Sequence, residues 1–187
     1  MTKGPQSLHL ASATIGALPI INQFITRLGL SDLLSQFLPA SANQKLPNAQ
    51  AILLFVRNIL IERQALYRLS EWAAPYDPSL VGLGRAPASV LNDDRVGRSL
   101  DALFLADRAS LLTAIVLKTI TEFAIDTSEL HNDSTTVTVT GQYKAPRSYR
   151  GKAAVWLTRG WNKDFRPDLK HNPNIWIMLL IPRIPLS

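Results

Sequence analysis

The sequence predicts a mainly helical amino-terminal domain followed by the first strands of an α/β or α+β domain. Over residues 14–127, apolar residues recur at steps of three and four, which is the spacing of amphipathic helices. Over residues 134–140 (STTVTVT), β-branched residues alternate at period two and end at Gly141, as expected of a strand with one buried face. The two patterns place a domain boundary near Thr127, where the helical spacing stops.

Apolar spacing and helix-ending residues define the first helices. Residues 15–28 carry isoleucine and leucine at helical steps, and Ser31 opens a short helix that ends before Pro39. Proline is well tolerated at the start of a helix, so the next helix is predicted to begin at Pro47 and to continue as an amphipathic stretch through residue 61.

A loop separates these helices from the later ones. Residues 67–74 add a helical turn or two, and residues 75–87 contain three prolines and two glycines, which predicts irregular structure. Asn92 or Asp93 can cap the next helix, which runs to Phe104, because a short side-chain acceptor satisfies N–H groups of the first turn. The remaining predicted elements are a helix over 107–125 and strands over 153–158 and 175–181.

The composition excludes several kinds of protein. The chain has 187 residues, of which 47% are hydrophobic and 18% charged, a globular rather than a disordered composition. It has no cysteine, which excludes disulfides, thiolate zinc sites and cysteine nucleophiles and fits a cytoplasmic protein. Its apolar stretches are far shorter than the roughly 20 residues that cross a bilayer, so no membrane partner is expected.

The positive charge is concentrated near the carboxyl end. Residues 1–140 carry 11 Lys and Arg against 12 Asp and Glu, a net −1, whereas residues 141–187 carry 9 against 2, a net +7. Spaced cations with aromatic residues between them suit phosphates and bases of a nucleic acid, although a solvated basic surface gives the same pattern. The candidate DNA-binding residues are Lys144, Arg147, Arg150, Lys152, Arg159, Lys163, Arg166 and Lys170.

Three charged residues outside that basic stretch can have either a structural or a functional role. Asp133 lies in the strand segment, where a buried carboxylate must be hydrogen-bonded, paired or metal-bound. It can hold Mg²⁺ in a phosphoryl-transfer site, or it can bond the local backbone. Arg95 and Arg98 share a helical face with Asp94 and Asp101, so they can form pairs within the helix or contact DNA.

Three segments together resemble a known family. Residues 91–103 (LNDDRVGRSLDAL) resemble a motif in the helical amino-terminal domain of DDE transposases from bacterial insertion sequences. Residues 130–136 (LHNDSTT), followed by Gly141, Gln142 and Tyr143, resemble the strand that bears the family's first catalytic aspartate. Residues 158–170 (TRGWNKDFRPDLK) are similar to a third family segment, and the three occur in the family's order.

The resemblance implies a fold, a reaction and a partner. The helical domain would span residues 1–127, a ribonuclease-H-like catalytic domain would start over 128–170, and 171–187 would be a divergent tail consistent with a frameshift. Asp133 would be a catalytic residue and the first of three acidic ligands of the Mg²⁺ ions that drive DNA strand cleavage and transfer.

The same resemblance also suggests how this chain departs from the family. The family's second Asp and its Glu have no counterpart, so Mg²⁺ binding is expected to be weak or absent and the chain to be a truncated, inactive form. The implied partner is DNA, at the ends of the element, and the implied assembly is a homodimer. The alternative is a non-catalytic helical DNA-binding or regulatory module, although the sequence shows no clear recognition-helix pattern.

Overall fold

The chain divides into two compact units, Met1–Ile115 and Val116–Ser187. The computed structural model describes residues 12–39, 44–84 and 86–128, and then the stretches 131–134, 137–139, 150–151, 158–159, 170–172 and 176–179. The division between the units falls inside the helix Arg108–Phe123, and the first strand begins later, at His131.

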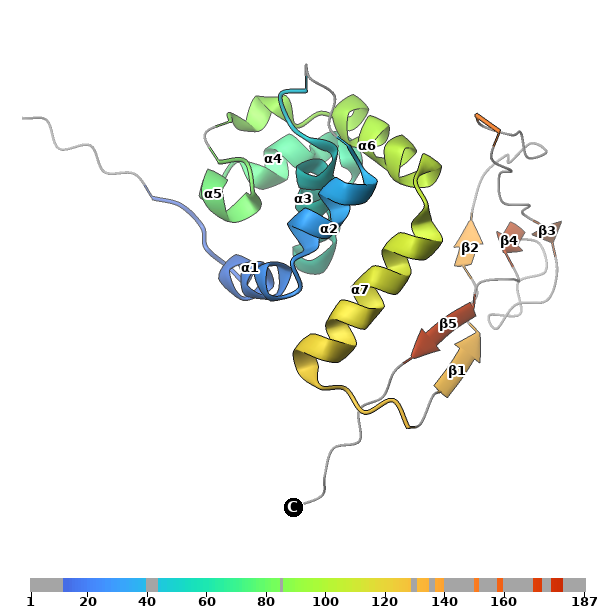
Figure 1. Cartoon of the computed structure of the whole chain (residues 1–187). Coiled ribbons are helices and arrows are strands. Elements are labelled where there is room, and N and C mark those ends of the chain that lie inside the picture. The colour runs from blue at the N-terminus through green and yellow to red at the C-terminus, as the bar shows by residue number, and fades with distance from the viewer. Residues whose placement is uncertain are drawn as a thin grey trace, which may run out of the picture. The chain divides into compact units, whose positions relative to one another are not determined.

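Helices make up most of the described structure as far as residue 128, which confirms the prediction of a mainly helical amino-terminal region (Figure 1). Two short 3-10 turns, η1 (Leu66–Arg68) and η2 (Ala88–Val90), connect some of the helices. The α-helices are α1 (Leu18–Arg27), α2 (Leu30–Phe37), α3 (Asn48–Ile61), α4 (Leu69–Ala73), α5 (Pro78–Val81), α6 (Asp93–Leu105) and α7 (Arg108–Phe123).

The helix starts follow the local chemistry of the sequence. Pro47 immediately precedes α3, as predicted. Asn92, of the two capping candidates, caps α6: its side-chain oxygen accepts a hydrogen bond from the Arg95 backbone N–H at 2.7 Å. The predicted loop over 75–87 is wrong in one respect, because it contains α5. There the Asp77 carboxylate accepts from the Ser79 N–H at 2.8 Å and so caps a single helical turn.

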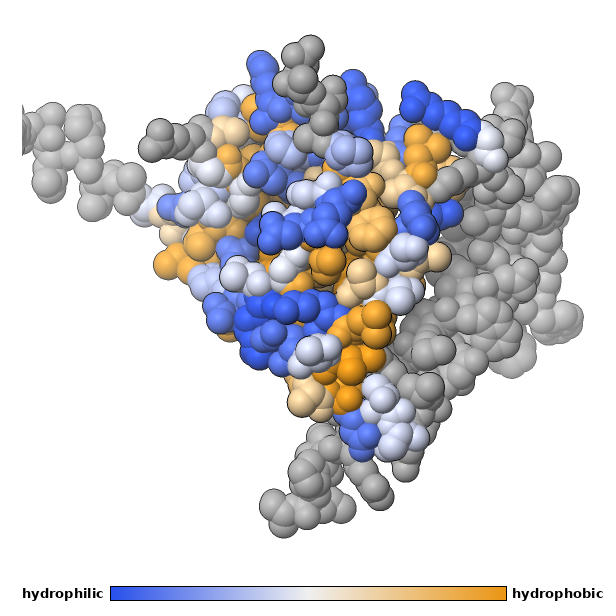
Figure 2. All heavy atoms as spheres, viewed as in Figure 1, coloured by the Kyte–Doolittle hydropathy of each residue, from blue (hydrophilic) through white to orange (hydrophobic). Residues whose placement is uncertain are grey.

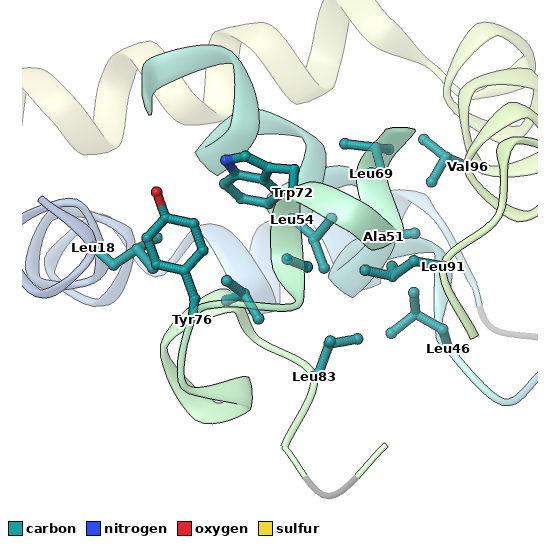
Figure 3. Packing of buried hydrophobic residues seen from close by; sticks show 12 residues of the cluster. Leu18, Leu46, Ala51, Leu54, Leu69, Trp72, Tyr76, Leu83, Leu91 and Val96 are labelled. Atoms are coloured by element: carbon teal, nitrogen blue, oxygen red, sulfur yellow. The ribbon is translucent and has the colours of Figure 1, made fainter. Parts of the chain in front are cut away.

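Helix α3 lies between two hydrophobic clusters of the first unit. Ala51 and Leu54 pack in a cluster with Leu18, Trp72 and Val96, among others (Figure 3). A second cluster takes the neighbouring α3 residues Ala49, Ile52 and Leu53 together with Ile25, Leu34, Leu38 and Leu111. The prediction of an amphipathic α3, with one buried face, is therefore incomplete. The helix packs on two sides and buries more than one face.

A buried arginine joins α1, α3 and α5. Arg57 is only 8% exposed, and its Nε donates to Asn22 Oδ1 at 2.8 Å. Asn22 in turn donates through Nδ2 to the Leu80 carbonyl at 2.8 Å. Burial lowers the pKa of the Arg57 guanidinium, because the charged form loses its water. These hydrogen bonds thus link three helices, α1, α3 and α5, to one buried charge.

Gly82, at the end of α5, is expected to be sensitive to substitution. Its φ is +88°, and a Cβ built there would lie 2.8 Å from Arg57 Nη1. Gly82→Ala should lower the free energy of unfolding by about 2 kcal/mol, since Arg57 would have to move while it bonds Asn22. Gly84→Ala is the matched control: φ is also left-handed (+58°), but nothing lies within 4 Å, so about 1 kcal/mol is expected. Equal losses in urea unfolding would contradict the proposed collision.

The second unit contains short antiparallel strands. β1 (His131–Ser134) pairs with β5 (Trp176–Leu179), and β4 (Lys170–Asn172) pairs with both β2 (Val137–Val139) and β3 (Thr158–Arg159). Of the strand predicted over 134–140, Ser134 belongs to β1 and residues 137–139 form β2, and these two strands are in different sheets. The predicted strand over 175–181 matches β5, whereas most of the one predicted over 153–158 lies outside the described residues.

Hydrophobic side chains also reach the surface of the helices (Figure 2). Ile20 and Phe24 of α1 are 65% and 47% exposed, and Leu112 of α7 is 63% exposed. No helix within the described ranges is long and apolar enough to cross a membrane.

Candidate nucleic-acid interface

Two of the predicted DNA-binding residues lie opposite each other on neighbouring strands. The register of β3 and β4 pairs Arg159 with Lys170, and the register of β2 and β4 pairs Lys170 with Val139. Arg150 is exposed in a turn with Gly151, and both residues have positive φ. The candidates that lie outside the described residues are Lys144, Arg147, Lys152, Lys163 and Arg166.

Asp133, the predicted catalytic residue and metal ligand, lies in β1 at the register position opposite Ile177 of β5. The side chains of this strand lie outside the described part of the chain. Among the residues that are described, no three His, Cys, Asp or Glu come close enough together to hold a metal ion. The metal-site prediction for Asp133 stays a prediction.

The first unit has a basic pocket of about 600 Å³, which the sequence did not predict. Its charged lining residues are Lys45, from the segment before α3, and Arg95 and Arg98, from the first two turns of α6. None of the described lining residues is acidic. The uncharged residues around it are Gln44, Leu46, Pro87, Ser89, Val90 and Asn92.

A buried polar network holds Arg95 in place. Arg95 Nη2 donates to Asn48 Oδ1 and, at 3.1 Å, to Ser99 Oγ. Asn48 and Ser99 are 6% and 0% exposed, and Asn48 Nδ2 donates to the Pro39 carbonyl at 3.2 Å, which fixes the direction in which its oxygen points. The guanidinium is therefore positioned by neutral groups of α3 and α6.

The charge of the pocket is not neutralised by neighbouring carboxylates. The ion pair suggested between Asp94 and Arg98 does not form within the described structure, and Arg98 and Lys45 are both exposed. The pKa of Arg95 is lowered, first by burial and then by repulsion from Arg98, yet an arginine remains protonated at neutral pH. Arg95 Nε is also buried without a hydrogen-bond partner.

A second, smaller hollow of about 180 Å³ shows the contrasting arrangement. There Arg68 is paired with Glu71 at 3.1 Å, and Glu62 accepts a hydrogen bond from Tyr76 Oη at 3.1 Å. Burial, together with this bond to Glu62, raises the pKa of Tyr76. This hollow is thus lined by one cation and two carboxylates, whereas no carboxylate is among the described lining residues of the pocket at α6.

Sequence reasoning missed Lys45, Asn48 and Ser99 as parts of a site. A signal existed for Ser99, which lies four residues after Arg95 and therefore on the same side of the helix. No signal connects Arg95 with Asn48, because 47 residues separate them and only the packing of α3 on α6 brings them together.

Comparison with protein families gives a match over the helical region. A family model described as "Domain of unknown function (DUF4277)" matches residues 10–117, more than half of the chain. The match includes the segment 91–103 and the basic pocket. No curated protein and no solved structure matches the chain.

Proposed function

The chain belongs to the DUF4277 family, a domain of unknown function, and we propose that it acts as a DNA-binding protein in insertion-sequence transposition of the DDE type. The observation that carries the proposal is the net charge of +7 over residues 141–187. Each phosphate that a lysine or arginine neutralises releases condensed counterions, and this release drives the binding of basic proteins to DNA.

Two further observations support DNA as the partner. Arg159 and Lys170 are directly opposite each other in an antiparallel pair, and such positions share one face of a sheet. The three segments that resemble DDE transposases also occur in the family's order and include both of these residues. The ribonuclease-H-like fold of the second unit and a homodimeric assembly are parts of the same proposal.

The proposal assigns Mg²⁺ a single acidic ligand. Two-metal phosphoryl transfer needs several oxygen ligands around each ion, and Asp133 is the one acidic residue that the resemblance assigns to that role. The described residues contain no cluster of acidic or histidine side chains that fits the ion. Binding of DNA is the activity proposed for these residues.

The proposal predicts salt-dependent binding that depends on the basic segment. Purified protein should bind a fluorescently labelled DNA duplex, with an affinity that falls steeply as salt is raised. The triple variant Lys163→Gln, Arg166→Gln and Lys170→Gln should bind at least about tenfold more weakly, because it neutralises fewer phosphates. Fluorescence anisotropy at several salt concentrations measures both effects.

A control variant separates specific contacts from total charge. Arg63→Gln, Arg68→Gln and Lys118→Gln together remove the same charge from exposed positions outside the basic segment. This variant should keep most of the affinity. Binding that does not depend on salt, or that falls equally in both triple variants, would contradict the proposal.

A further inference from the structure

The basic pocket at α6 has features that point to an anionic ligand. Lys45, Arg95 and Arg98 converge on it without a carboxylate among its described lining residues. Arg95 and Arg98 lie three residues apart on α6, so their charges are neighbours on one side of the helix. Bringing two guanidinium groups together costs free energy unless an anion offsets the repulsion.

The positive charge of the pocket comes from side chains and not from the helix end. The Asn92 side chain already accepts from the Arg95 N–H at 2.7 Å, and the Asp93 carboxylate accepts from the Asp94 N–H at 3.0 Å. The first turn of α6 therefore has its own acceptors. What remains for a ligand are the exposed cationic groups of Lys45 and Arg98 beside the fixed guanidinium of Arg95.

The size and the apolar lining indicate more than a bare phosphate. A volume of about 600 Å³ is in the range of about 300–1,000 Å³ that holds drug-sized ligands, so a nucleotide unit would fit. Val90, which is half-buried, adds apolar surface beside the cations, whereas Leu46 is only 1% exposed. Figure 3 shows Leu46 close to Leu91, the residue before the α6 cap, so the two segments that border the pocket meet there.

We propose that this pocket binds one nucleotide of a DNA strand, with the phosphodiester against Lys45, Arg95 and Arg98 and the sugar or base against Pro87 and Val90. The inference rests on the proposed DNA-binding function and adds a second contact site in the helical unit. Arg95 suits a phosphate because Nη1 makes no hydrogen bond to the described residues, and the bonds from Nη2 to Asn48 and Ser99 hold the guanidinium in one orientation.

The test uses the full chain with Lys45→Gln and Arg98→Gln, both exposed positions whose replacement should not disturb the core. Binding to a labelled DNA strand should weaken at least about fivefold near 0.1 M salt. The slope of log K against log salt should become shallower by about 1 for each phosphate that the variant no longer neutralises. The control, Arg63→Gln with Arg68→Gln, removes the same charge from exposed positions outside the pocket and should change both quantities less.

The possible outcomes separate this inference from the proposed function. If the unmodified chain binds no DNA, the proposed function fails. If it binds DNA and the pocket variant behaves like the control, only the pocket assignment fails. A nucleoside monophosphate added to the DNA complex should compete in the unmodified chain and not in the pocket variant. If the monophosphate instead raises the melting temperature of the unmodified chain alone while DNA binding is the same in both, the ligand is a free nucleotide and the DNA assignment is overturned.

Discussion

Leu54→Ala is expected to lower the free energy of unfolding by about 3–5 kcal/mol, the largest stability effect predicted for this protein. Leu54 is 0% exposed and lies in the cluster with Trp72, Leu69 and Ala51, as Figure 3 shows. Truncation removes apolar surface from the core and leaves a cavity, because helices on either side of α3 cannot both move inward. Urea unfolding followed by circular dichroism measures the loss.

Leu60→Ala is the matched control for this experiment. It makes the same chemical change on the same helix, but Leu60 is 62% exposed. The expected loss is about 0.5 kcal/mol or less, since little apolar surface and no cavity are involved. Similar losses at both positions would contradict burial of Leu54 as the cause of the effect.

Asn48→Leu is expected to lower the free energy of unfolding by about 3 kcal/mol. The substitution removes the oxygen that accepts from the Arg95 guanidinium and also the hydrogen bond from Asn48 Nδ2 to the Pro39 carbonyl. Hydrogen bonds to charged groups contribute about 1.5–3 kcal/mol, and a polar group left unpaired in the interior adds a desolvation cost. Asn48 itself is 6% exposed, so its hydrogen bonds lie close to the interior of the unit.

A double-mutant cycle tests that explanation. Arg95→Leu removes the charge that Asn48 satisfies, so the double variant Asn48→Leu with Arg95→Leu should lose less stability than the sum of the two single losses. The coupling should be at least about 1 kcal/mol, as expected for residues in one hydrogen-bond network. Strictly additive losses would show that the Asn48 side chain stabilises the fold independently of Arg95.

The positions of the main helices could be predicted because the determining forces are local. Apolar spacing in α1 and α2, the proline before α3 and the Asn92 cap of α6 are all properties of a few neighbouring residues. The single turn α5 was missed because three prolines and two glycines in the segment 75–87 predict a loop. The Asp77 cap that supports it is as short-range as the caps that were recognised.

The strand pattern did not predict which strands pair. The alternating run over 134–140 predicts extended backbone, but a period of two carries no information about which strands pair. The structure ends β1 at Ser134 and begins β2 at Val137, and their partners, β5 and β4, come from much later in the chain. Pairing over such distances is set by the whole sheet and not by the local pattern.

The sequence by itself determined the helical character of the first unit and the concentration of positive charge over residues 141–187. Only the tertiary structure brought Asn48 to Arg95, placed the Arg57 side chain next to Gly82, and put Lys45 and Arg98 in the lining of one pocket. The physical reason is distance along the chain. Helix formation and capping act over a few residues, whereas these contacts exist because α3 packs against other helices and brings remote segments together.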